Sequence, residues 1–144
     1  MRVFFDTSVL VAAMIQSHPQ HELAFPWLDR GRRGALTFLV AAHSLAEVYA
    51  VLSSYPTRPR LGPSLAARLL RENVQASARV VALSARDYGA VIQQMAEAGL
   101  AGAVVYDALL ARAAQKAEAE RLLTLNPRDF LRVWPEGASV VGGP

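Results

Sequence analysis

Short apolar runs alternate along this chain with longer segments that favour helix, and this alternation limits the possible folds more than any other feature. The runs are Val3–Phe5, Ala35–Val40, Arg79–Leu83, Arg121–Leu125 and a shorter fifth at Ser139–Val141. The helical segments between them are Val9–Ile15, Gln20–Arg33, Ala42–Ser54, Ser64–Val74, Ala85–Ala98 and Ala103–Glu120. Such alternation predicts an α/β domain in three layers, whose mostly parallel sheet of four to five strands is flanked by helices. A length of 144 residues suits a single domain spanning residues 1–144.

Prolines, glycines and capping residues set the expected boundaries of these segments. Pro26 should interrupt the second helix, and the prolines of Tyr55–Pro63 forbid both helix and sheet interior, which predicts a loop. Ser84 is a candidate N-cap for the helix after the third strand. Asn126-Pro127 should stop the fourth strand, and the tail Gly142–Pro144 is expected to fray.

Several protein classes are excluded by what the sequence lacks. With no Cys there is no disulfide scaffold, thiol nucleophile, Cys-ligated zinc or iron–sulfur cluster. No apolar run reaches the ~20 residues of a membrane span, and Asp6 interrupts the only stretch that resembles a signal peptide. G-x-S-x-G, Walker A and G-x-G-x-x-G motifs are all missing, which argues against an α/β-hydrolase, a P-loop enzyme and a dinucleotide enzyme. We therefore expect a soluble cytoplasmic protein that does not contact a membrane.

The charge is mildly basic and is carried almost entirely by arginine. The formal net charge is +3, and Lys116 is the only lysine. Arginine suits phosphate recognition because its planar fork donates two parallel hydrogen bonds. Arg30–Arg33, Arg58–Arg60 and Arg128 are candidates for phosphate contacts, with an ordinary solvated surface as the alternative. The charge permits a nucleic-acid partner without demonstrating one.

Acidic side chains from separate parts of the sequence are expected at one edge of the sheet. Asp6 ends the first strand, and Asn126 and Asp129 follow the fourth. Glu47 and Asp107 lie in the first turns of helices that begin at the same edge, because a returning helix runs antiparallel to its strands. Carboxylates packed this closely repel unless a divalent cation joins them. Oxygen ligands without Cys or an obvious His favour Mg²⁺ or Mn²⁺ over Zn²⁺.

Each of these residues also has a simpler explanation. Asp6 can cap the helix that follows it, and Ser44 with Glu47 fits the S-x-x-E capping box, which would turn that carboxylate back to its own backbone. Asn126 and Asp129 are ordinary residues for a turn around a proline. Asp107 lies on an apolar helix face, where a carboxylate is costly unless paired, and this favours a functional role.

The three histidines are not expected in the acidic site at the edge of the sheet. His18, His21 and His43 have no ligand partners at metal-binding spacing, which predicts surface or packing roles.

Four motifs follow one another along the chain. They are Val3-Phe4-Phe5-Asp6-Thr7-Ser8, Ser44-Leu45-Ala46-Glu47-Val48, Tyr106-Asp107-Ala108-Leu109-Leu110-Ala111 and Leu123-Thr124-Leu125-Asn126-Pro127-Arg128-Asp129-Phe130. Together, in this order, they resemble the PIN-domain family, and in particular the VapC-type toxin ribonucleases of toxin–antitoxin pairs. The resemblance spans nearly the whole chain. It implies a PIN-like, Rossmann-like fold and a metal-dependent endoribonuclease that hydrolyses RNA phosphodiester bonds with Mg²⁺ or Mn²⁺.

The resemblance also implies site residues and partners. Asp6, Glu47 and Asp107 would be the core catalytic and metal-binding carboxylates. Asn126 stands where many relatives carry Asp, and Asp129 would then supply the missing charge as a further catalytic and metal-binding residue. Hydrogen bonds from Thr7, Ser8 or Thr124 would orient a carboxylate or water. The implied partners are an RNA substrate, a cognate antitoxin and a second copy of the chain in a homodimer.

Two other functions are alternatives to the nuclease. A catalytically silent PIN-fold module that binds RNA or protein is supported by Asn126, which removes one acidic group. A phosphoacceptor receiver domain also ends a parallel strand in Asp, but it needs paired acids after its first strand and a lysine late in the chain. Here the only lysine, Lys116, falls inside a predicted helix.

Overall fold

Five parallel strands form the central sheet of the computed structural model, which describes residues 1–144. The strands are β1 (Arg2–Phe5), β2 (Thr37–Ala41), β3 (Arg79–Val81), β4 (Arg121–Leu123) and β5 (Val141–Gly142). Their spatial order is β3-β2-β1-β4-β5, so the first strand in the sequence lies at the centre. The predicted α/β fold with a parallel sheet is confirmed.

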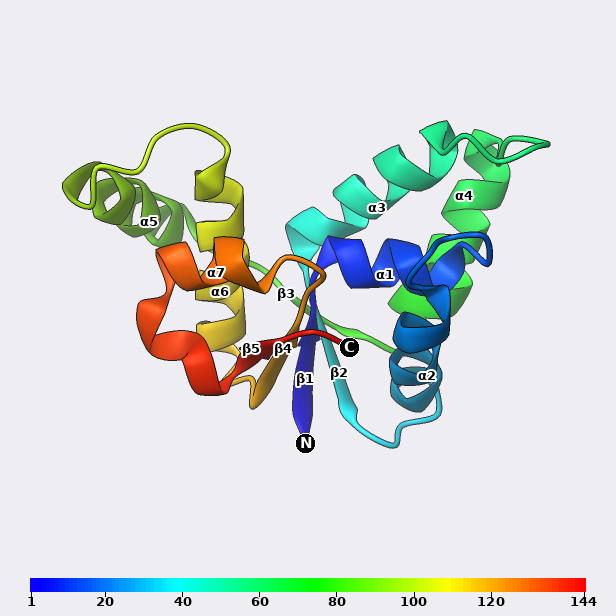
Figure 1. The fold of residues 1–144 in the computed structure, drawn as a ribbon, viewed down its shortest axis with the longest axis horizontal. Helices are drawn as coiled ribbons and strands as arrows, with labels where there is room; N and C mark the ends of the chain where they lie inside the picture. Colours follow the sequence, from blue (N-terminus) through cyan, green and yellow to red (C-terminus); the bar gives the residue numbers. More distant parts are fainter.

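Seven helices cover the two faces of this sheet (Figure 1). On one face lie α1 (Thr7–Met14), α2 (His21–Arg32), α3 (Ala42–Ser54) and α4 (Pro63–Leu70). On the other lie α5 (Ala85–Glu97), α6 (Val104–Lys116) and α7 (Pro127–Val133). None of the helices is long and apolar enough to cross a membrane.

Side chains of β1 divide the hydrophobic core into two halves. Val3 and Phe5 pack into the cluster beneath α1 to α4, whereas Phe4 packs into the cluster beneath α5 to α7. All three side chains are fully buried, as expected for a central parallel strand whose alternate residues face opposite helix layers.

The register of the central strands determines which residues meet at their carboxyl ends. Phe5 pairs with Leu123, and the backbone N–H of Asp6 donates a 2.9 Å hydrogen bond to the Leu123 carbonyl. Asp6 and Thr124 therefore leave the sheet side by side, although 118 residues separate them in the sequence.

Several predicted boundaries are wrong, and each has a local physical reason. Pro26 does not interrupt α2, because the backbone donor it lacks would have bonded the carbonyl of Glu22 in the exposed first turn, where water can replace it. The long helix ends at Lys116 rather than Glu120, because Glu118 adopts a left-handed conformation (φ 52°) that turns the chain into β4. The helix predicted at Ser64–Val74 is confirmed in extent: it is α-helical over Pro63–Leu70 and continues as a wider π-helical turn over Arg71–Gln75.

Predictions about the last quarter of the chain were the least complete. Helix α7 and the 3₁₀ turn Pro135–Ser139 were not predicted, and both begin with a proline at a position where no backbone donor is needed. The expected fraying of the tail is wrong for Gly142, whose carbonyl accepts a 3.0 Å hydrogen bond from the Thr124 backbone N–H. The sheet thus extends to a fifth strand at Val141–Gly142.

The two predicted capping serines have different outcomes. Ser84 caps α5 in a complete capping box with Asp87, as its position in the sequence suggested. Ser44 caps nothing, because α3 begins at Ala42 and places this side chain inside the helix, where its hydroxyl is buried without a hydrogen-bond partner. The alternative in which Glu47 belongs to a capping box is therefore wrong.

We expect the variants Ser44→Ala and Ser84→Ala to differ in stability for this reason. Ser44→Ala removes a buried, unpartnered hydroxyl and improves helix propensity, so its free energy of unfolding should equal or exceed that of the parent. Ser84→Ala removes the N-cap hydrogen bond of α5 and should lower the free energy of unfolding by about 1 kcal/mol. Urea denaturation followed by circular dichroism measures both. An equal loss of stability in the two variants would contradict this account of α3.

Candidate active site

Four of the predicted site residues line one cavity of about 400 Å³ at the carboxyl edge of the sheet. Asp6 follows β1, Glu47 lies in the second turn of α3, Asp107 in the first turn of α6, and Asn126 at the N-cap of α7. In Figure 1 the loops after β1 and β4 and the first turns of α3 and α6 meet at the upper end of the strands. The fifth predicted residue, Asp129, does not line the cavity, but its charge acts on Asp107.

Asp6 is the most buried acid of the site, with 8% of its surface exposed. Its Oδ2 accepts hydrogen bonds from Ser8 Oγ (2.7 Å) and Thr124 Oγ1 (2.8 Å). Burial raises the pKa of Asp6 above its ordinary value, and the two hydroxyl donors offset part of that rise. Asp6 stands at the N-cap of α1 without capping it, so the simple capping role is wrong.

The two hydroxyls that hold Asp6 are themselves held by the chain after β4. Thr124 Oγ1 accepts a 3.0 Å hydrogen bond from the backbone N–H of Asn126, and Ser8 Oγ accepts one of 3.1 Å from the backbone N–H of Leu125. Each hydroxyl accepts from a fixed amide and therefore directs its own proton at Asp6. Thr7, the third residue considered for this role, makes no such contact, and its hydroxyl is buried without a partner.

Glu47 carries an oxygen that no hydrogen bond satisfies. Its Oε1 is buried, and although His43 Nε2 lies 3.1 Å away, the pair lacks hydrogen-bond alignment. Burial is the largest influence on the pKa of Glu47 and raises it; His43 lowers it, and the charge of Asp6 raises it further. His43, which was predicted to have a surface or packing role, therefore contributes to the electrostatics of the site. Its position one helical turn before Glu47 is the sequence signal for this contact.

Asp107 has a strongly perturbed titration. Desolvation, followed by the charges of Asp6, Asp129 and Glu47, raises its pKa from 3.8 to about 6, and Arg132 only partly opposes this. Three neighbouring carboxylates thus raise the cost of ionising Asp107. An acidic group with nearby like charges and too few donors is typical of a functional site.

The donor set of the pocket fits a divalent cation. No three acidic or histidine side chains approach closely enough here to form a ready-made metal site. The chemistry is nevertheless suitable, because the available ligands are carboxylate and amide oxygens, which Mg²⁺ and Mn²⁺ prefer. Glu47 Oε1 has no hydrogen-bond donor, and the mutual repulsion of Asp6, Glu47 and Asp107 is the kind that a cation relieves.

Comparison with known proteins gives a family match over most of the chain. The family model described as PIN domain matches residues 3–133. Ribonuclease VapC27 of Mycobacterium tuberculosis is 37% identical over 115 residues, which cover 80% of this chain and 78% of the relative. Ribonuclease VapC40 of the same organism is 35% identical over 123 residues, or 85% of each chain.

Two solved structures share the fold at lower sequence identity. The M. tuberculosis toxin VapC20, described as cleaving the sarcin–ricin loop, aligns with a TM-score of 0.63 and 17% identity over 83% of this chain and 86% of that one. VapBC2 of Rickettsia felis, bound to a DNA fragment from its promoter, aligns with a TM-score of 0.65 and 19% identity over 99% and 98%.

The raised pKa of Asp107 predicts how the chain's stability depends on pH in the absence of divalent ions. An acid whose pKa rises on folding destabilises the folded state as it ionises: the effect is absent below about pH 3.8, develops between 3.8 and 6, and is complete above 6. In EDTA at pH 8, Asp107→Asn should therefore be more stable than the parent by about 1 kcal/mol, a value reduced for solvent screening of a half-exposed group. This advantage should disappear towards pH 4.

Urea denaturation between pH 4 and 8 measures this difference, and Glu136→Gln, which removes an exposed acid without an ion pair, is the control. If the free energy of unfolding of Asp107→Asn differs from that of the parent by the same amount at every pH, the repulsion inferred at this site is contradicted.

Proposed function

Because this chain belongs to the PIN-domain family and is homologous to the VapC-type ribonuclease toxins, we propose that it is an Mg²⁺- or Mn²⁺-dependent endoribonuclease. One observation carries the proposal beyond family membership. Asp6, Glu47 and Asp107, contributed by three separate segments of the chain, line one cavity and raise the cost of ionising one another. Neither Asp6 nor Asp107 has an ion-pair partner and Glu47 has only His43, at 3.1 Å, whereas a catalytic cation would offset the charge of all three.

The residues in and around the pocket would have separate roles in hydrolysis. Asp6 and Asp107 would hold the cation, with Asn126 and Asp129 completing the polar surroundings. Such an ion, when bound, neutralises charge that develops on a phosphate and makes water a better nucleophile. The carboxylate of Glu47, whose Oε1 accepts no hydrogen bond, would take the proton that the attacking water releases. Thr124 and Ser8 keep Asp6 in a single orientation.

The proposed substrate is single-stranded or looped RNA, since an unpaired backbone can enter a pocket at the edge of a sheet. Arg128, an exposed residue two positions after Asn126, is the arginine that we propose contacts a phosphate near the site. The name of the fold relative that cleaves the sarcin–ricin loop is consistent with RNA as substrate. By the same homology we propose a VapB-type antitoxin as partner, a homodimer as the assembly and the cytoplasm as the place of action.

A second candidate function is RNA or protein binding without cleavage. It is favoured by Asn126, which supplies an amide where a further carboxylate would strengthen cation binding. Intact RNA binding with no cleavage under Mg²⁺ or Mn²⁺ would support it and would overturn the nuclease proposal.

The main test is the loss of cleavage on replacing the proposed cation ligands. Asp6→Asn and Asp107→Asn should each lower the rate of RNA cleavage in Mg²⁺ or Mn²⁺ by more than ~100-fold, since even outer partners of metal ligands contribute about 10- to 100-fold. EDTA should abolish the activity of the parent. Gel analysis of labelled RNA measures the rate, and thermal melts verify folding. Activity equal to that of the parent in either variant would remove these carboxylates from the mechanism.

A second prediction concerns the hydroxyl that positions Asp6. Thr124→Val keeps the volume of this fully buried side chain but removes its hydrogen bond, so cleavage should fall by about 10- to 100-fold. The activity that remains should need a higher Mg²⁺ concentration, because a less ordered carboxylate binds the cation more weakly. Thr37→Val, the same change at an exposed position of β2, is the control. An unchanged Mg²⁺ requirement in Thr124→Val would count against the positioning role.

A further inference from the structure

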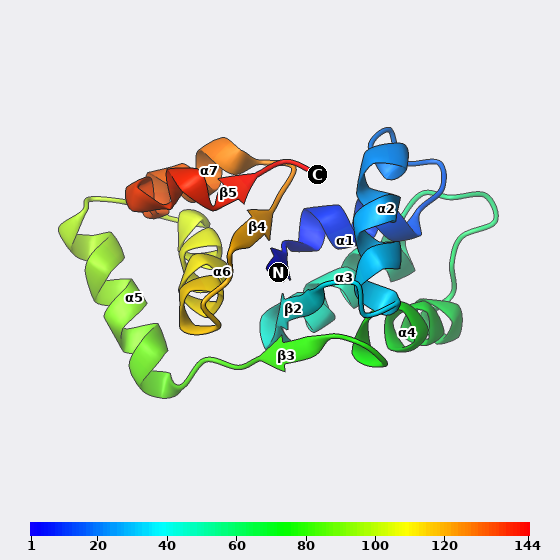
Figure 2. The ribbon, with the colours of Figure 1, turned by 90° about the horizontal axis from the view of Figure 1, so that it is seen from below.

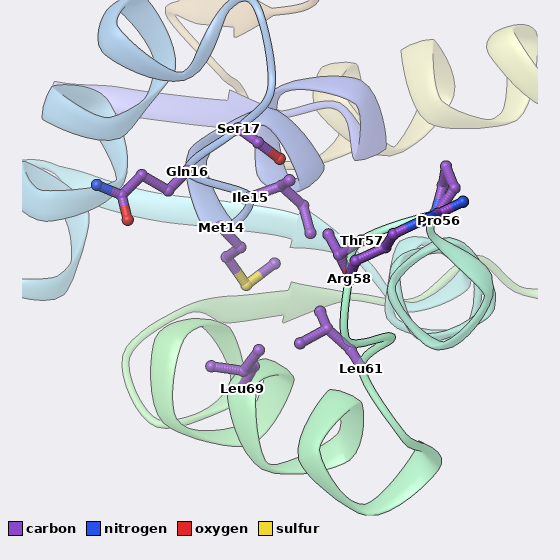
Figure 3. Close-up of a pocket in the computed structure, with 9 residues that line it drawn as sticks. All are labelled: Met14, Ile15, Gln16, Ser17, Pro56, Thr57, Arg58, Leu61 and Leu69. Atoms are coloured by element: carbon purple, nitrogen blue, oxygen red, sulfur yellow. The ribbon is translucent and has the colours of Figure 1, made fainter.

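A second cavity, of about 540 Å³ (Figure 3), is larger than the candidate active-site pocket and shares none of its lining residues. It is lined by the end of α1 and the loop that follows, by the proline-rich loop between α3 and α4, and by Leu69 of α4. Its volume falls within the range of about 300–1,000 Å³ that is usual for small-molecule sites. Nothing in the proposed chemistry at Asp6, Glu47 and Asp107 uses this space.

Two loops connect this cavity to the active site. Ser17 lines the cavity and the next residue, His18, lines the active-site pocket; likewise Pro56 lines the cavity and the preceding residue, Tyr55, lines the pocket. Because consecutive residues line them, the two hollows adjoin each other. The surface formed by the two together is the groove along which a longer ligand would lie.

The lining of the cavity combines an apolar floor with a polar, basic edge. Met14, Ile15, Leu61 and Leu69 converge on its centre in Figure 3, which gives flat apolar groups a surface to contact. At the edge, Thr57 Oγ1 is buried and has no hydrogen-bond partner. A buried hydroxyl without a partner is unusual in a folded protein and is satisfied when a polar ligand enters.

The charge of the lining favours a polyanion. Arg58 lines the cavity, Arg60 follows in the same loop, and no acidic side chain lies among the lining residues. The carboxylates gather instead at the other end of the groove. This separation matches an RNA strand whose scissile phosphate lies at the acidic end, where a cation would offset the charge, and whose next phosphate meets an arginine.

We propose that this cavity is a nucleobase subsite that binds one unstacked base of the RNA substrate beside the cleaved bond. The inference rests on the nuclease function proposed above. The base would lie on the apolar floor, one of its polar edge atoms would pair with Thr57 Oγ1, and Arg58 would contact the neighbouring phosphate. Binding of one base outside the active site would give the enzyme a sequence or structure preference at that position.

The test combines base removal in the RNA with substitution in the cavity. A cleaved RNA oligonucleotide is prepared as a series in which each nucleotide around the cleavage site is made abasic in turn. For the parent chain, removal of the base at one position only should lower kcat/KM by about tenfold or more. This is the loss expected when the contacts of one bound base are removed. Leu61→Trp, a filling change on a loop residue, should remove this position-specific loss.

Milder variants separate the two polar contacts. Thr57→Val should weaken discrimination between bases at the sensitive position while leaving the abasic substrate unaffected. Arg58→Ala should raise KM for all substrates alike. Thr37→Val and Arg86→Ala are the matched controls, because both residues are exposed and Arg86 lies on α5, at the opposite end of the molecule from α4 (Figure 2). Thermal melts establish that each variant is folded.

The same comparison by binding alone distinguishes failure of the subsite from failure of the nuclease function. RNA affinity is measured by fluorescence anisotropy in EDTA with the Asp6→Asn chain, where no cleavage is expected. Suppose that the parent does not cleave RNA, that one abasic position still weakens RNA binding, and that Leu61→Trp removes this effect. The subsite proposal is then supported and the nuclease proposal is not. If every abasic substrate behaves alike, or Leu61→Trp leaves the sensitive position unchanged, the subsite proposal is overturned. A loss confined to binding of a protein antitoxin, with RNA kinetics unchanged, also overturns it.

Discussion

The buried carboxylate of Asp6 is the group on which the arrangement of the site depends. It lies at the carboxyl end of the central strand, where burying a charge is costly unless donors or a cation stabilise it. Two hydroxyls, Ser8 and Thr124, provide part of this stabilisation, and each is oriented by a backbone amide of the segment after β4. The pairing of β1 with β4 therefore sets both the position and the orientation of this carboxylate.

A comparison of two acids in this chain separates a structural carboxylate from a functional one. Asp6 and Asp87 are equally buried, each with 8% of its surface exposed. The pKa of Asp87 falls well below its usual range because Lys116, Ser84 and Arg112 surround it with donors. Asp6 has only neutral donors, and burial raises its pKa. Burial alone does not mark a functional acid; burial without a compensating cation does.

Charge is unequally distributed along the groove above α1. Acids converge at the end formed by the sheet edge, whereas the end formed by the loop between α3 and α4 carries Arg58 and no acid. An RNA backbone is repelled at the first end unless a cation binds there, and it is attracted at the second. The proposed nuclease chemistry and the proposed base subsite are thus two consequences of the same polarity, and the cation requirement links them.

Local sequence patterns were enough to predict the layered α/β fold and the helix at Ala42–Ser54, because strand and helix patterns depend on local side-chain periodicity. They also predicted that Asp6, Glu47, Asp107 and Asn126 would meet, since parallel strands end at one edge. Packing of the whole chain was needed to show that Ser44 caps nothing and that Glu47 faces the pocket beside His43. It was also needed for the order of the strands, which brings Thr124 against Asp6, and for the two short helices between Pro127 and Ser139. Short motifs such as S-x-x-E fit several local conformations, and only packing against the rest of the chain selects one of them.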